Sequence, residues 1–253
     1  MSLQGTLVPK QSEKGGRETF PLFFFIAILV SFVSFQRNIA WDEELSIWQD
    51  AVRKSSHKAR PHSNLGAAFG GKRLFHEGAR ESRIAIYLNP YLAEAHNNLG
   101  NIYLEMGLAQ DALKEFQDAV ELEPSFAVAH YNAGLAYKAI GLMEEAQKEF
   151  KKAVEIRPFY AKAHNELGMQ YMTNGMYEAA VTEYNKALEG DNRFAPTYNN
   201  RGVVYARLGM WDNAIKEFQK AMSIDPALTE VEKNLKKAYA NREAAVRKAV
   251  KNP

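Results

Sequence analysis

The 253-residue chain contains no cysteine, and this absence removes several kinds of site at once. It excludes disulfide bonds, a thiolate nucleophile, and any zinc or iron–sulfur centre with cysteine ligands. The chain also lacks an excess of charge, because 32 basic side chains nearly balance 30 acidic ones and leave a formal net charge of +2. A net charge this small gives no general electrostatic reason to expect a nucleic acid as a partner.

Catalytic motifs are missing as well, since the sequence has no zinc-protease helix, nucleophile elbow or pair of catalytic carboxylates. We therefore expect no enzymatic activity and no cofactor. Histidines do recur every 34 residues, at positions 62, 96, 130 and 164. At usual helix-packing distances such residues stand about 10 Å apart, whereas zinc needs its nitrogen ligands at about 2 Å. We interpret the column as packing and predict no metal site.

One long apolar run stands out from this balanced composition. Between Phe20 and Phe35, twelve of sixteen residues are Phe, Leu, Ile or Val, and none is charged. As a helix the run spans about 24 Å, and its flanks extend it towards the roughly 30 Å of a bilayer core. The sequence therefore predicts a single transmembrane anchor over residues 20–36. A cleaved signal peptide and a buried helix of a soluble core are the alternatives.

Positive charge indicates the orientation of this anchor. Three basic residues precede the run, whereas acidic residues follow it soon after Arg37. The positive-inside rule then keeps the tail of residues 1–19 in the cytoplasm. The chain after the anchor is expected on the periplasmic or lumenal side, beginning with a membrane-proximal helix within residues 37–58. That helix would present an interface made of Trp41, Leu45, Trp48 and Val52.

A period of 34 residues dominates the remainder of the chain. A residue pair that ends in glycine recurs at Leu65-Gly66, Leu99-Gly100, Ala133-Gly134, Leu167-Gly168 and Arg201-Gly202. Tyrosine recurs at 103, 137, 171 and 205, a second glycine at 107, 141, 175 and 209, alanine at 112, 146, 180 and 214, and an aromatic residue at 116, 150, 184 and 218. This pattern resembles the tetratricopeptide repeat family. It divides the chain into repeats 1 to 5, at 59–92, 93–126, 127–160, 161–194 and 195–228, with a capping helix over 229–253.

The resemblance implies an all-α fold, a right-handed solenoid of helical hairpins. The residues give a physical reason for it, because their apolar positions form one stripe on each of two helices per repeat. A single hairpin cannot cover its own apolar face, so neighbouring hairpins stack. We expect repeat 1 to be the loosest, since Gly70-Gly71 interrupts its first helix. We expect the cap to bury Val231, Leu235, Tyr239 and Val246.

A column of asparagines is the strongest candidate for a binding site. It comprises Asn64, Asn98, Asn132 and Asn200, with Glu166 in the remaining repeat. In similar repeat arrays such asparagines bind the main chain of an extended peptide, because an amide both donates and accepts hydrogen bonds. The alternative is a hydrogen-bond ladder that only aligns the repeats. The neighbours expected on the same concave wall are Asn97, Asn101, Tyr131, Lys138 and Asn165.

The sequence thus predicts a membrane-anchored scaffold that binds a protein or an extended peptide in its concave groove. The alternative is a constitutive structural subunit, packed against a polytopic membrane complex through the anchor and the helix that follows it. A second resemblance concerns that junction. The stretches 37–41, 45–48 and 59–66 are similar to the segment before the repeats in polytopic, O-mannosyltransferase-like membrane proteins with tetratricopeptide tails. The match covers no catalytic part of that family, so it implies no transferase activity.

Overall fold

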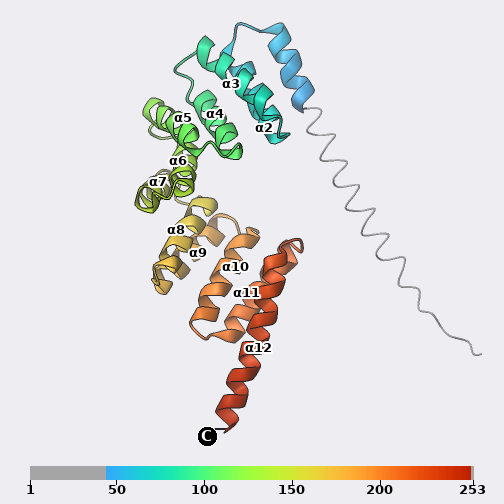
Figure 1. Cartoon of the computed structure of the whole chain (residues 1–253), viewed down its shortest axis with the longest axis vertical. Coiled ribbons are helices and arrows are strands. Elements are labelled where there is room, and N and C mark those ends of the chain that lie inside the picture. The colour runs from blue at the N-terminus through green and yellow to red at the C-terminus, as the bar shows by residue number, and fades with distance from the viewer. Residues whose placement is uncertain (1–43, 252–253) are drawn as a thin grey trace, which may run out of the picture. The chain divides into compact units, whose positions relative to one another are not determined.

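The computed structural model describes residues 44–251, and within them every regular element is a helix (Figure 1). A helix over residues 44–54 comes first. It is followed by α2 (Ala59–Gly71), α3 (Phe75–Leu88), α4 (Ala93–Glu105), α5 (Ala109–Leu122), α6 (Ala127–Ala139), α7 (Met143–Ile156), α8 (Ala161–Thr173), α9 (Tyr177–Gly190), α10 (Ala195–Arg207), α11 (Trp211–Ile224) and α12 (Thr229–Lys251). The predicted all-α class is confirmed for this part of the chain.

The predicted anchor over residues 20–36 lies outside the described residues, and so does Trp41. Among the residues that are described, no helix is long and apolar enough to cross a membrane. The other members of the predicted membrane-proximal interface, Leu45, Trp48 and Val52, lie on the helix over residues 44–54, where each is half-buried. The anchor and its orientation therefore stay predictions.

Each repeat folds as a helical hairpin with a first helix of 13 residues and a second of 14, as α4 and α5 show. The second helix of one repeat packs on the first helix of the next, for example α5 on α6 and α9 on α10. First helices also approach their successors closely, from α2 to α4, α4 to α6, α8 to α10 and α10 to α12.

Glycine ends the first helix in four of the five repeats. Gly107, Gly141, Gly175 and Gly209 have φ angles of 78°, 85°, 74° and 72°, in the left-handed region that favours glycine. In repeat 1 the same position belongs to Arg73, with a φ of 61°. The first helix of that repeat nevertheless runs unbroken to Gly71. The expectation that Gly70-Gly71 interrupts it is therefore wrong.

A second glycine lets the two helices of each repeat come close together. A Cβ on Gly134 would lie 2.5 Å from the ring of Phe150, and the corresponding glycines of repeats 2, 4 and 5 face their aromatic residues in the same way. Repeat 1 has Ser82 at the aromatic position, and there a Cβ on Gly66 would lie 2.4 Å from the serine Oγ. In repeat 1, α2 and α3 thus pack directly on each other, where an aromatic ring lies between the two helices in the other four repeats.

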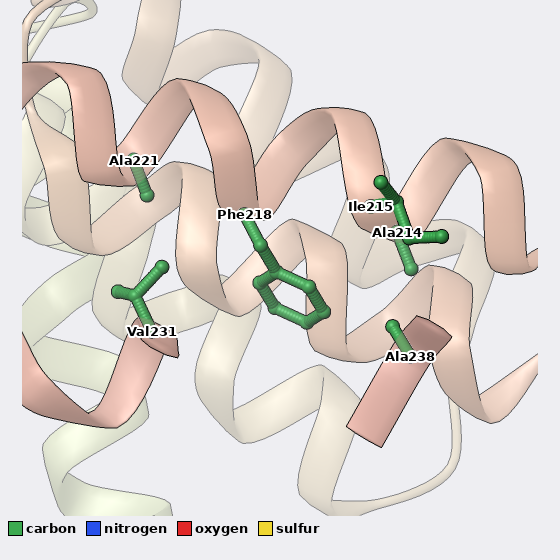
Figure 2. Close-up of a cluster of buried hydrophobic side chains, with 6 residues drawn as sticks. All are labelled: Ala214, Ile215, Phe218, Ala221, Val231 and Ala238. Carbon is green, nitrogen blue, oxygen red and sulfur yellow. The ribbon is translucent and has the colours of Figure 1, made fainter. Parts of the chain in front are cut away.

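The capping helix buries only its first half. Val231 and Ala238 of α12 lie against Phe218 of α11 (Figure 2). Leu235 packs on the same cluster. Val246 is 58% exposed, so its predicted burial is wrong. Tyr239 is 39% exposed, and its hydroxyl accepts a hydrogen bond from Gln219 at 2.9 Å. The physical reason is length, because α12 has 23 residues whereas α11 has 14.

Candidate protein-binding surface

Asparagines at the sixth position of the repeats connect neighbouring first helices. At four junctions the side-chain amide donates a hydrogen bond to a residue 35 positions earlier. The bonds run from Asn98 to the Ser63 hydroxyl at 3.0 Å, from Asn132 to Asn97 at 2.8 Å, from Asn200 to Asn165 at 3.0 Å, and from Asn234 of α12 to Asn199 at 2.9 Å. They form the inter-repeat ladder that the sequence offers as the alternative to peptide binding.

The ladder is broken between α6 and α8. At that rung Glu166 replaces the asparagine, and Tyr131 stands at the position of its acceptor. Glu166 instead accepts a hydrogen bond from Lys138 Nζ at 2.6 Å. The ring of Tyr131 packs on Phe150 and Tyr160, with centroids 5.8 and 5.2 Å away. An ion pair thus replaces the amide hydrogen bond at this rung, so the junction of repeats 3 and 4 differs from its neighbours.

Three hollows lie at equivalent places between successive helical hairpins. Their volumes are about 370 Å³ between repeats 1 and 2, about 390 Å³ between repeats 3 and 4, and about 290 Å³ between repeat 5 and α12. Each is lined by the end of a first helix, the start of the following second helix and the next first helix. We call the residues that line the three hollows the inner face. They include Gly70, Phe75, Asn98, Asn101, Ile102, Lys138, Met143, Gln147, Met169, Gln170, Thr173, Arg207, Trp211, Asn234 and Lys237.

The inner face contains some of the predicted contact residues. Asn98 and Asn101 line the first hollow, and Lys138 lines the second. The others, which are Asn64, Asn97, Tyr131, Asn132, Asn165 and Asn200, line none of these three hollows. Within this second group, Asn97, Asn132 and Asn165 are buried, with exposed fractions of 5%, 7% and 4%. A buried amide that already bonds to a neighbour offers little surface to a peptide.

Sequence reasoning missed the contribution of the second helices to this face. Met143 and Trp211 are the first residues of α7 and α11, and each lines a hollow. The signal that could have found them is their common position, since Phe75, Met143 and Trp211 all follow the turn of their repeat at the same offset.

The recurring histidines link the two helices within a repeat. In each, the ring Nδ1 faces a glutamate 19 residues later, and Nε2 faces a main-chain carbonyl six residues earlier. The pairs are His62–Glu81, His96–Glu115, His130–Glu149 and His164–Glu183, with Nδ1 to oxygen distances of 2.7, 2.8, 2.6 and 2.7 Å. A main-chain carbonyl can only accept a hydrogen bond, so each ring donates from Nε2, while Nδ1 lies within hydrogen-bond distance of the glutamate.

Three members of these pairs, His96, Glu149 and Glu183, have shifted pKa values. The hydrogen bond to Glu115 raises the pKa of His96 above its usual value of 6.5, against the burial that lowers it. Burial raises the pKa of Glu149, but hydrogen bonds from the histidine and from a lysine outweigh it and hold this pKa below 4.5. The pKa of Glu183 is lowered in the same way. A raised histidine pKa and a lowered glutamate pKa both favour the charged forms of these side chains.

The pairs should make stability depend on pH in a defined window. A raised histidine pKa stabilises the fold below its unfolded value of 6.5, and this contribution is lost as pH rises through the folded pKa. A lowered glutamate pKa stabilises the fold at pH values above the unfolded pKa of 4.5. That contribution is lost as the pH falls through the folded pKa. We expect Glu115→Gln to cost more unfolding free energy at about pH 5.5 than at about pH 9, measured by urea denaturation with a chelator present. An equal cost at both pH values would show that His96 is not held as a cation.

Models of one repeat family match three stretches of the chain. A model described as tetratricopeptide repeat matches residues 97–161, one described as TPR repeat matches residues 168–209, and another tetratricopeptide repeat model matches residues 195–228. Among curated protein sequences, none matches the chain.

Solved structures share the fold. YrrB, described as a TPR protein with an unusual peptide-binding site, is 21% identical, with 75% of this chain and 97% of that chain covered and a TM-score of 0.56. MamA is 27% identical, with 64% and 95% covered and a TM-score of 0.56. PilF of Pseudomonas aeruginosa is 16% identical, with 79% and 91% covered and a TM-score of 0.67. The likeness to YrrB and PilF concerns the fold alone.

Proposed function

Because the chain belongs to the tetratricopeptide repeat family, we propose that it is a scaffold that binds an extended segment of a partner protein on its inner face. The observation that carries this proposal is the recurrence of a hollow at equivalent junctions along the array. A row of similar hollows suits a chain that passes over several repeats. The peptide-binding site reported for YrrB is a property of that protein, and it supports the proposal by analogy only.

The chemistry of the inner face fits an extended main chain with intervening side chains. Each hollow contains side-chain amides, such as Asn101, Gln170 and Asn241, which can pair with both the N–H and the C=O groups of a peptide. Each also contains apolar surface, from Ile102, Met169 or Trp211, that can cover an apolar side chain.

The hollow between repeats 3 and 4 is the proposed centre of binding. It is the largest of the three, at about 390 Å³, and it adjoins the broken rung of the ladder. Met143 in its lining is 51% exposed, and methionine adapts its shape readily to a bound side chain. The Lys138–Glu166 ion pair at this junction supplies charge beside the apolar lining. We propose that a large apolar residue of the partner occupies this hollow.

We further propose that the scaffold is tethered to a membrane through residues 20–36, with the repeats on the non-cytoplasmic side. This proposal is supported by the uncharged apolar run and by the basic residues that precede it. Partners of a tethered scaffold lie at the same membrane surface. They include an integral membrane complex, which is also the partner in the alternative of a permanent subunit.

Affinity purification of the tagged full-length chain in detergent tests the inner face directly. We expect Met143→Glu combined with Thr173→Glu to weaken capture of the partner about tenfold or more, because two carboxylates would occupy the apolar hollow. The matched control, Gln110→Glu with Ser125→Glu, adds the same charge at two exposed positions outside the hollows and should leave capture unchanged.

The melting temperature of both double variants must stay close to that of the unchanged chain for this comparison to count. Equal capture by the two variants would contradict the inner-face proposal. Stoichiometric co-purification of a polytopic protein that neither variant disturbs would instead support the permanent-subunit alternative.

A further inference from the structure

The histidine–glutamate pair of repeat 2 has an acidic neighbour at a position where repeats 3 and 4 have lysine. Asp118 lies one helical turn after Glu115 on α5, and its Oδ2 is 3.9 Å from His96 Nδ1. The same Nδ1 lies 2.8 Å from Glu115 Oε2, and the three ligand atoms are all within 4.8 Å of one another. Lys152 and Lys186 hold the position of Asp118 in repeats 3 and 4, where each pairs with its glutamate.

This exchange reverses the local charge. In repeats 3 and 4 the lysine at this position neutralises the single carboxylate beside the ring. In repeat 2 two carboxylates face the same ring nitrogen and repel each other. A divalent cation bound by both carboxylates and the nitrogen would offset their two negative charges and remove this repulsion.

The histidine is already oriented as a ligand. Its Nε2 donates to the main-chain oxygen of Pro90 at 3.1 Å, which leaves Nδ1 directed at the carboxylates. Metal-bound histidines commonly donate their other ring N–H to such a carbonyl, which fixes the ring. His96 is 8% exposed and therefore held, whereas the Asp118 side chain is 42% exposed and free to adjust. Ligand atoms that bind zinc at about 2.1 Å stand about 3–3.5 Å apart, so a small rotation of Asp118 completes the geometry.

We propose that repeat 2 binds a divalent metal ion through His96 Nδ1, Glu115 and Asp118, and that this ion is Zn²⁺. A water molecule completes the tetrahedral set. One nitrogen and two carboxylate ligands suit Zn²⁺, whereas Mg²⁺ and Ca²⁺ prefer oxygen ligands throughout. An ion at this position is bound within one repeat, so the spacing of about 10 Å between histidines of successive repeats does not oppose it. Because none of the three ligands lines a hollow, the site is independent of the proposed binding of a partner.

Titration of the full-length chain with Zn²⁺ in a calorimeter tests the site. We expect one saturable Zn²⁺ ion per chain, no comparable binding of Mg²⁺, and a melting temperature that rises with the Zn²⁺ concentration. The variant Asp118→Lys copies the residue of repeats 3 and 4, so it should fold and should bind Zn²⁺ at least about tenfold more weakly. The exposed histidines elsewhere in the chain are unchanged in this variant. Zn²⁺ that binds to them would therefore bind both proteins equally, and only binding at the proposed site would be lost.

The converse variant offers a gain of function. Lys152→Asp places a carboxylate beside the His130–Glu149 pair, so we expect the stoichiometry to rise from one Zn²⁺ ion to two. Absence of saturable binding to the unchanged chain would overturn the proposal. Equal Zn²⁺ affinity of the unchanged chain and the folded Asp118→Lys variant would overturn it as well.

Discussion

Ala146→Leu is expected to lower the free energy of unfolding by about 1–3 kcal/mol, because it adds a larger side chain to a fully buried helix contact. Ala146 is fully buried, in a cluster with Phe150 and Leu167. The Phe150 ring of α7 already lies directly against the backbone of α6, since a Cβ on Gly134 would meet the ring at 2.5 Å. Three additional carbon atoms at position 146 would therefore displace either the ring or the helix.

Chemical denaturation of three variants measures this effect. Ala180→Leu, at the equivalent buried position of repeat 4, should lose a similar free energy. Lys148→Ala on the exposed face of α7 should change stability by no more than about 0.5 kcal/mol. If Ala146→Leu unfolds at the same denaturant concentration as the unchanged chain, the close helix contact described for repeat 3 does not exist in solution.

Asn132→Ala is expected to cost about 1–3 kcal/mol, because it leaves a buried acceptor without its donor. The Oδ1 atom of Asn97 accepts from Asn132 at 2.8 Å, and the Asn97 residue is only 5% exposed. Asn200→Ala should cost less, about 0.5–1.5 kcal/mol, since its acceptor on Asn165 also receives a hydrogen bond from Thr197 at 3.1 Å. Asn132 is itself buried whereas Asn200 is half-buried, so burial and the unpaired oxygen both place the larger loss at Asn132.

Thermal unfolding and partner capture should be measured on both asparagine variants. A ladder that aligns the repeats lowers the melting temperature and leaves capture by the folded protein unchanged. Reduced capture without loss of stability would show instead that these amides contact the partner. Equal destabilisation by Asn132→Ala and Asn200→Ala would contradict the account based on the remaining Thr197 donor.

The 34-residue period was enough to predict the class of fold and the role of its small residues. A glycine at a fixed offset after an apolar stripe, such as Gly141, predicts a turn because only glycine adopts a φ of 85° without strain. Repeat 1 shows the limit of that reasoning. Gly70 and Gly71 suggested a break by composition alone, but packing against α3 and α4 keeps α2 helical to its end.

The candidate site was predictable in part. The asparagine column indicated polar contacts on the first helices, but the sequence could not decide whether each amide faces a neighbouring repeat or a ligand. That choice depends on which residues of neighbouring repeats face each other, and the pairing of residues 35 positions apart is set only when the helices stack. The break at Tyr131 and Glu166 was visible as two separate exceptions, and only the structure shows that they belong to one rung.

By itself, the sequence determined the all-helical class, the hairpin repeat and the residues that allow helices to approach, because these follow from local spacing and side-chain size. Only the tertiary structure decided which polar groups pair, where the hollows lie and how much of α12 is covered. The reason is physical. A periodic stripe fixes which face of a helix is buried, whereas hydrogen-bond partners and cavities depend on the offset and separation of helices that are distant in the chain.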